Sequence, residues 1–163
     1  MKRFVFAALM AAALVIPASA QDAPGVNARG QVRLTDQVRP LRYEMTITPN
    51  AEALTLAGEV TIDLNVVSQQ QEIVVNALDL EIDRVALDGR PAASTRYQEN
   101  DQTLHMNFAG PIPAGRHALT ISYRGRIYRQ AQGLFAQDYD LEGGGEGRML
   151  VSQFQAADAR RFV

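Results

Sequence analysis

The sequence predicts an all-β protein made of antiparallel strands. From residue 41 onward, apolar side chains recur at every second position, which is the spacing of a strand with one buried face. Clusters of Gly, Pro, Asn and Asp separate these segments at intervals of about 8–12 residues. Beyond the first 20 residues, no segment shows the period of a helix. Together these observations predict an antiparallel β-sandwich or a related multi-sheet structure.

Four strands are predicted in the first half of the chain. The second of them contains Ala57-Gly58, which predicts a bulge or bend in its middle. The fourth is closed by Asp88-Gly89, a typical two-residue hairpin turn. The predicted strands are, in order, 41–48, 54–66, 73–75 and 80–87.

The second half repeats this style with four more predicted strands. A turn rich in Gly and Pro at residues 110–115 separates the first two, and Gly143-Gly144-Gly145 separates the last two. We see no internal sequence repeat. The predicted strands are 104–108, 119–123, 134–139 and 148–155.

Composition limits the chemistry that the chain can carry. Its 163 residues hold 16 basic and 18 acidic groups, two histidines and no cysteine. Without cysteine there is no disulfide, thiol nucleophile or cysteine-ligated zinc. Two histidines leave little material for any other metal site. The mild net negative charge gives no electrostatic reason to expect nucleic-acid binding.

Residues 1–20 have the pattern of a secretory signal peptide. Lys2 and Arg3 precede an apolar run of 13 residues, and Pro17 and three small residues follow it. The run is shorter than the ~20 residues that span a bilayer, so we expect cleavage before Gln21 and no membrane anchor afterwards. We therefore expect a secreted, periplasmic protein, with a flexible lead-in at 21–32 and a β domain at 33–163.

Neither histidine predicts a metal site. His105 alternates with apolar neighbours, so we expect it on the opposite face of its strand, in contact with water. His117 begins a strand, and the two histidines lack the spacing of a zinc helix motif. The acidic residues between 138 and 146 lack the order of a calcium loop and are interpreted as a solvated hairpin tip.

The segment 151–155 is a candidate binding strand. Period two places Gln153 and Gln155 on one face and Phe154 on the other. Two amides on one face can offer carbonyl oxygens to an ammonium group. From spacing alone, two solvated glutamines are the favoured explanation, because polar alternation is common in half-exposed strands.

Six stretches of the chain resemble, in order, the N-terminal domain of the aminopeptidase N family of zinc metallopeptidases. The last is the most specific: Ser152 to Arg161 is similar to that family's T-Q-F-E-x-x-D-A-R-R. The resemblance covers nearly the whole chain after the leader. The stretches are 39–43 (R-P-x-x-Y), 56–60 (F-x-G-x-V), 75–80 (L-N-A-x-D-L), 113–125 (L-x-x-G-x-Y-x-L-x-I-x-Y-x-G), 133–135 (G-L-Y) and 152–161.

This resemblance implies a saddle-like β domain that packs against a zinc-bearing catalytic domain. Gln153 matches the family glutamine of a Q-x-E strand that holds the free α-ammonium of the substrate peptide. Gln155 stands where the family usually has Glu, so a neutral amide replaces the carboxylate. These two are the predicted substrate-binding residues, and we predict no catalytic or metal-ligating residue in the chain.

The zinc motifs that the resemblance implies, H-E-x-x-H and G-x-M-E-N, do not occur in the sequence. We expect the chain to be the N-terminal part of a zinc aminopeptidase, cut before its catalytic domain and inactive alone. Zinc is implied only for the full-length enzyme. Two alternatives remain open: a stand-alone binding or structural β module, and one half of a split enzyme whose catalytic domain docks in trans.

Overall fold

The computed structural model describes residues 25–26, 32–155 and 157–162. The predicted signal peptide and most of the predicted lead-in lie outside these residues. No helix in the described part of the chain is long and apolar enough to cross a membrane.

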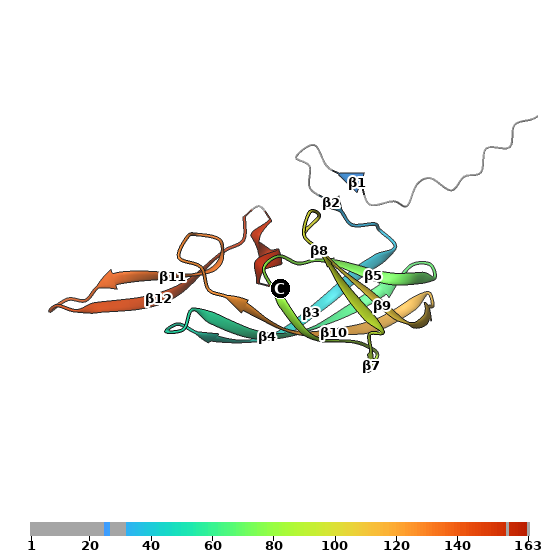
Figure 1. The fold of residues 1–163 in the computed structure, drawn as a ribbon, viewed down its shortest axis with the longest axis horizontal. Helices are drawn as coiled ribbons and strands as arrows, with labels where there is room; N and C mark the ends of the chain where they lie inside the picture. Colours follow the sequence, from blue (N-terminus) through green and yellow to red (C-terminus); the bar gives the residue numbers. More distant parts are fainter. Residues whose placement is uncertain (1–24, 27–31, 156, 163) are drawn as a thin grey trace, which may run out of the picture.

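The described residues confirm the all-β prediction, with four antiparallel sheets (Figure 1). The largest has the strand order β3-β4-β10-β6-β7 and faces a three-stranded sheet, β5-β9-β8. Hairpin β11–β12 extends beyond these two sheets at one end, and β1 pairs with β2. The bounds are β1 Gly25–Val26, β2 Val32–Arg33, β3 Val38–Asn50, β4 Thr55–Val66, β5 Gln70–Asn76, β6 Glu81–Leu87, β7 Arg90–Pro91, β8 Ser94–Gln98, β9 Thr103–Ile112, β10 Gly115–Arg126, β11 Gly133–Asp140, β12 Glu146–Gln153 and the 3₁₀ turn η1 Asp158–Arg161.

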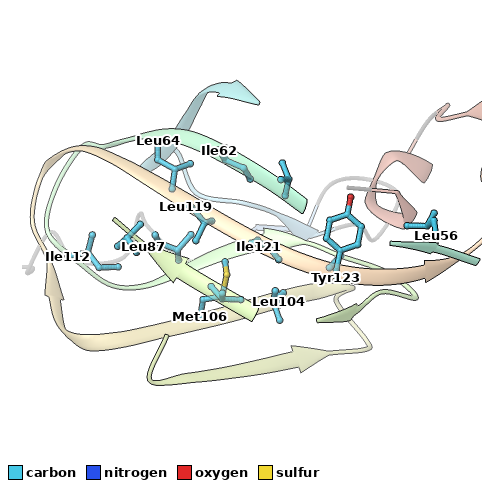
Figure 2. Close-up of a cluster of buried hydrophobic side chains, with 14 of the residues drawn as sticks. Leu56, Ile62, Leu64, Leu87, Leu104, Met106, Ile112, Leu119, Ile121 and Tyr123 are labelled. Carbon is cyan, nitrogen blue, oxygen red and sulfur yellow. The ribbon is translucent and has the colours of Figure 1, made fainter. Parts of the chain in front are cut away.

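The core lies between the five-stranded and the three-stranded sheet (Figure 2). Strand β4 alternates between buried and more exposed residues along most of its length, as its period-two pattern predicts. Leu119 of the central strand β10 lies between its pairing partners Ile62 and Leu87. The opposite sheet contributes Leu104 and Met106 from its own central strand, β9. The alternation seen in the sequence is therefore the inner face of a two-layer sandwich.

The predicted bulge at Ala57-Gly58 is wrong. Strand β4 runs without interruption, and its pairing with β10 shows no register shift. Gly58 is there because its partner Tyr123 lays its ring directly over the glycine, where a Cβ would overlap ring atoms. The register shift of the outer pair lies instead at Leu41, between Pro40 and Arg42 of β3. The glycine marks a close approach of a side chain, which is the other common reason for glycine in a strand.

Two further features differ from the sequence prediction: strand β8, which was not predicted, and the exposure of His105. Strand β8 carries exposed side chains over most of its length, so it has no alternating pattern for a sequence reading to detect. His105 does lie on the face opposite Leu104 and Met106, but its imidazole is largely covered rather than open to water. Its strand is central, so cross-strand neighbours flank the ring, and Glu72 Oε2 lies 3.2 Å from Nδ1.

The Asp88-Gly89 turn joins β6 to β7 as predicted, with positive φ at both residues. The Asp88 carboxylate is hydrogen-bonded to His117, whose side chain is 8% exposed. His117 Nδ1 lies 2.7 Å from Asp88 Oδ2, and His117 Nε2 lies 3.0 Å from the Pro113 carbonyl oxygen. The hydrogen bond that His117 donates to the Asp88 carboxylate raises the pKa of His117. Partial burial would raise the pKa of Asp88, but bonds from Ala118 N–H and His117 lower it overall.

This pair predicts a pH-dependent stability. Because the pKa of His117 is raised in the folded state, its contribution is complete below the unfolded value of about 6.5 and is lost as pH rises through the folded pKa. The contribution of Asp88 to stability depends on pH in the opposite direction. It is lost as pH falls through the lowered pKa of the Asp88 carboxyl. Urea unfolding should therefore give a lower free energy at about pH 8 than at about pH 5.5. In His117→Gln that difference should shrink, and an unchanged difference would assign it to other groups.

Candidate functional site

The two glutamines predicted to bind substrate lie at the end of hairpin β11–β12. Gln153 is the last residue of β12 and pairs with Gly133, the first residue of β11. The strand ends there, so Gln155 lies in a turn and the prediction that both occupy one strand face is wrong. Both side chains remain exposed and lie two residues apart. The structure thus brings them together through a turn and not through the pleat of a strand.

The turn is shaped by Gln153 itself. The backbone N–H of Gln155 donates to Gln153 Oε1 at 3.0 Å, so the glutamine side chain closes the turn in place of the next ladder bond. The ring of Phe154, between them, packs on the ring of Phe162 with 5.1 Å between centroids. Asp158 N–H donates to the Phe154 carbonyl at 3.2 Å. The two amides are therefore presented to solvent from a folded support.

That support is held against the sandwich by its backbone. The Tyr123 hydroxyl donates to the Phe162 carbonyl at 2.6 Å, and the Leu78 N–H donates to the Arg160 carbonyl at 2.8 Å. Figure 2 shows Tyr123 on β10, beside the 3₁₀ turn. Burial raises the pKa of Tyr123 to about 12, so its hydroxyl stays protonated and can donate near neutral pH.

Asp79 anchors the same segment through its side chain. Its Oδ2 accepts from Arg126 Nη2 at 2.8 Å, from the Tyr128 hydroxyl at 2.7 Å and from Arg161 Nη1 at 2.6 Å. Arg161 also donates to Asp158 at 3.0 Å. We call these five residues the Asp79 cluster. It joins the loop before β6, the end of β10 and the 3₁₀ turn at a single carboxylate.

The charge state of this carboxylate is fixed by its donors. Partial burial alone would raise the pKa of Asp79, but the hydrogen bonds from Tyr128 and Arg126 and the nearby positive charges lower it overall. Asp79 also adopts a positive φ of 58°, which Asp tolerates better than most residues. The lowered pKa keeps Asp79 ionised near neutral pH. Its hydrogen bonds and its backbone conformation identify it as a structural anchor.

Asp79→Asn is expected to lower the free energy of unfolding by about 1–2 kcal/mol, because three donors lose a charged acceptor while the backbone conformation stays accessible. Asp83→Asn is the matched control. Asp83 bonds to Arg124 on the exposed face, where solvent screening makes the contribution of such a pair small. Chemical unfolding monitored by circular dichroism measures both. Equal losses in the two variants would contradict an anchoring role for the Asp79 cluster.

The chemistry available at the glutamines is hydrogen bonding. Each amide offers a carbonyl acceptor and an NH₂ donor, and neither group transfers a proton near neutral pH. Among the described residues, no three His, Asp or Glu side chains gather in a group that could hold a metal ion. The predicted acidic hairpin tip is partly ion-paired, since Asp138 bonds to Arg148 and Arg129.

The antiparallel β domain described above belongs to a class of domains found in peptidases, as its sequence shows. Residues 39–163 match the family described as the Peptidase M1 N-terminal domain. The chain belongs to this family and represents the N-terminal domain of an M1 aminopeptidase.

Curated relatives carry aminopeptidase names. Aminopeptidase M1-D of Oryza sativa subsp. japonica is 33% identical over 135 residues, which cover 82% of this chain and 15% of that protein. Aminopeptidase N of Acetobacter pasteurianus is 32% identical over 83% of this chain and 38% of its own length. Aminopeptidase M1 of Arabidopsis thaliana is 30% identical over 82% of this chain and 16% of its own length. The chain thus spans well under half the length of these relatives.

Proposed function

We propose that this chain is the N-terminal domain of a secreted, periplasmic zinc aminopeptidase and that it helps to hold the free N-terminus of the substrate peptide. One observation supports this most directly: Gln153 and Gln155 stand exposed and adjacent on a turn that is fixed to the sandwich. The turn lies within the stretch that matches the family. The catalytic domain, in cis or in trans, is the proposed partner.

The proposed binding step uses carbonyl oxygens of this chain. A peptide α-ammonium has three N–H donors, and the amides of Gln153 and Gln155 can each accept one. The α-ammonium is charged with either acceptor, but a carboxylate adds the attraction of an opposite charge that an amide lacks. The Gln at 155 therefore gives a weaker hold on the ammonium than the Glu that is usual at the matching position.

Among the described residues, no three His, Asp or Glu side chains lie close enough together to hold a zinc ion. Zinc is proposed only for the catalytic partner, where it would supply the hydrolytic chemistry. The role proposed for this chain is to bind and orient the substrate amine and to provide the surface on which that partner packs. The fixed turn limits the freedom that the two amides lose on binding.

A chimera tests this proposal. Residues 33–163 replace the matching stretch of aminopeptidase M1 of Arabidopsis thaliana, and hydrolysis of an aminoacyl-nitroanilide is measured. We expect activity in the chimera and none in this chain alone with added zinc. Gln155→Glu in the chimera should lower KM about fivefold with kcat changed less than twofold, since a carboxylate adds about 1 kcal/mol to the ammonium contact.

Gln137→Glu is the matched control, because Gln137 is an exposed glutamine on β11 of the same hairpin. It should leave KM unchanged. A folded chimera without activity would contradict the aminopeptidase role. An active chimera in which both substitutions have the same effect would contradict the assignment of Gln155 to the amine site.

A further inference from the structure

The side-chain carbonyl of Gln153 already uses one of its two acceptor positions. Its Oε1 accepts the backbone N–H of Gln155 at 3.0 Å. An amide carbonyl oxygen has two lone pairs, so one remains for the ammonium group of the proposed function. The turn bond fixes the direction of that second lone pair relative to the backbone of residues 153–155. The position of this backbone therefore decides where the amine is held.

The backbone of Gln153 is supported by Gly133, its pairing partner at the base of hairpin β11–β12. Gly133 is buried and has a left-handed φ of 58°. A Cβ at this position would lie 3.1 Å from the Cβ of Arg161 and 3.6 Å from the Asp158 carbonyl oxygen. The glycine therefore lets the base of the hairpin lie directly against Arg161 of the 3₁₀ turn η1 (Figure 1).

The side chain of Arg161 is held in one orientation. Its Nε donates to Asp158 at 3.0 Å, and its Nη1 donates to Asp79 at 2.6 Å and to the Tyr128 hydroxyl at 3.2 Å. The side chain is largely buried. A planar guanidinium that donates to three groups at once cannot rotate without losing at least one of them. The surface that Arg161 presents to Gly133 is therefore rigid.

Tyr128 fixes both sides of this contact. Its backbone N–H donates to the Leu134 carbonyl at 2.9 Å, and its carbonyl accepts the Ala136 N–H at 2.8 Å, so its main chain pairs with β11. Its buried hydroxyl accepts from Arg161 and donates to Asp79 at 2.7 Å. One residue thus binds the hairpin through its main chain and Arg161 through its side chain. The hairpin and Arg161 keep a fixed relative position as a result.

We propose that Arg161 is a positioning residue for the amine site and that it acts through Gly133 and Gln153. Its side chain, held by the Asp79 cluster, is the support for the Gly133–Gln153 pair, and so it fixes the place at which Gln153 Oε1 meets the substrate ammonium. No contact between Arg161 and the substrate is part of this role. The inference rests on the proposed function, because it takes Gln153 to be an acceptor for the amine. A small displacement of such an acceptor weakens a directional hydrogen bond.

Steady-state kinetics of the chimera test this inference. Gln153→Ala removes the acceptor and should raise KM about tenfold, as expected for one hydrogen bond to a charged group. Arg161→Ala should raise KM about fivefold and change kcat less than twofold. A variant that only folded less well would lower the active fraction, which lowers the apparent kcat and leaves KM unchanged. Arg161→Lys keeps the methylene stem beside Gly133 and a positive charge for Asp79, so it should raise KM about twofold at most.

The double variant Gln153→Ala/Arg161→Ala shows whether Arg161 acts through the glutamine. Its KM should equal that of Gln153→Ala alone, because an acceptor that has been removed no longer needs support. Independent effects would instead multiply to about fiftyfold. Arg129→Ala is the matched control, since it removes an exposed arginine that pairs with Asp138 of the same hairpin. It should leave KM unchanged.

Gly133→Ala tests the same contact from the hairpin side. The added methyl group must displace Arg161 or the base of the hairpin, so KM should rise at least threefold. Alanine is also strained at a positive φ, and Gly89→Ala is the control for that strain. Gly89 has a φ of 77°, and a Cβ there would meet nothing within 4 Å. Gly89→Ala should leave KM unchanged, and equal effects of the two substitutions would count against the contact.

Amide hydrogen exchange of this chain gives a readout that needs no catalytic domain. Arg161→Ala should speed exchange of the Gln155 N–H at least fivefold, because the turn that this N–H closes loses its support. The amides of the central strand β10 should exchange at an unchanged rate. Equal acceleration in β10 would overturn the inference, because it would assign Arg161 to the stability of the whole domain.

Two kinetic results would also overturn the inference while leaving the proposed function intact. One is that Arg161→Ala leaves KM within twofold although Gln153→Ala raises it. The other is that the double variant shows the product of the two single effects. An unchanged KM in Gln153→Ala would contradict the proposed amine site itself, and this inference with it. The pattern of results therefore shows which of the two has failed.

Discussion

Gly58→Ala is expected to lower the free energy of unfolding by about 2–4 kcal/mol, although it adds a single methyl group. A Cβ at this position would overlap the ring of Tyr123 on the paired strand β10. Tyr123 is buried as part of the hydrophobic core, so moving its ring disturbs its packing there. The substitution should therefore either displace the ring or separate the two central strands.

Displacing Tyr123 has a second consequence. Its hydroxyl holds the Phe162 carbonyl at 2.6 Å, and that contact fixes the segment supporting the glutamine turn. We therefore expect Gly58→Ala to increase the protease sensitivity of the segment after residue 153 as well as to lower stability. Thermal unfolding and limited proteolysis measure the two effects separately.

A matched control and a double mutant make this prediction specific. At Gly125 a Cβ would approach only the ends of Leu80 and Leu56, which can adjust, so Gly125→Ala should cost less than half as much. The double mutant Gly58→Ala/Tyr123→Leu should lose less unfolding free energy than the sum of the two single mutants. We expect a coupling energy of about 1 kcal/mol or more. Additive losses would show that the ring is not the cause.

The general architecture could be predicted from the sequence because apolar and polar residues alternate along the central strands, and the apolar ones form the buried face. The β4 pattern and the Asp88-Gly89 turn are local signals, and both were confirmed. The exposed strand β8 has no apolar face and so gave no signal. Gly58 was misinterpreted because a glycine that makes room for a ring looks, in the sequence, like one that permits a bulge.

The candidate site was only partly accessible to sequence reasoning. The pair Gln153 and Gln155 was found by spacing and by resemblance, but the end of β12 between them depends on a side chain closing the turn. The Asp79 cluster was missed altogether. Its Asp79, Tyr128 and Arg161 come from three distant segments, so only the tertiary fold brings them together. Asp79 and Arg161 did lie in two of the stretches that resemble the family, which was the available signal.

Leu119→Ala is the second substitution with a large expected effect, about 3–4 kcal/mol of lost unfolding free energy. Leu119 is 0% exposed and lies at the centre of the large sheet, between Ile62 and Leu87. Because strands β4 and β6 flank it on both sides and the opposite layer includes Met106, the surrounding side chains can fill little of the space left behind. The cost therefore combines lost burial with a residual cavity.

Leu41→Ala is the matched control, since it removes the same atoms at a position that is 50% exposed on edge strand β3. Its expected loss is about 0.5 kcal/mol or less. Urea unfolding of both variants, with m-values compared to confirm a shared unfolding transition, measures the difference. If Leu41→Ala costs as much as Leu119→Ala, the edge of β3 is buried in solution.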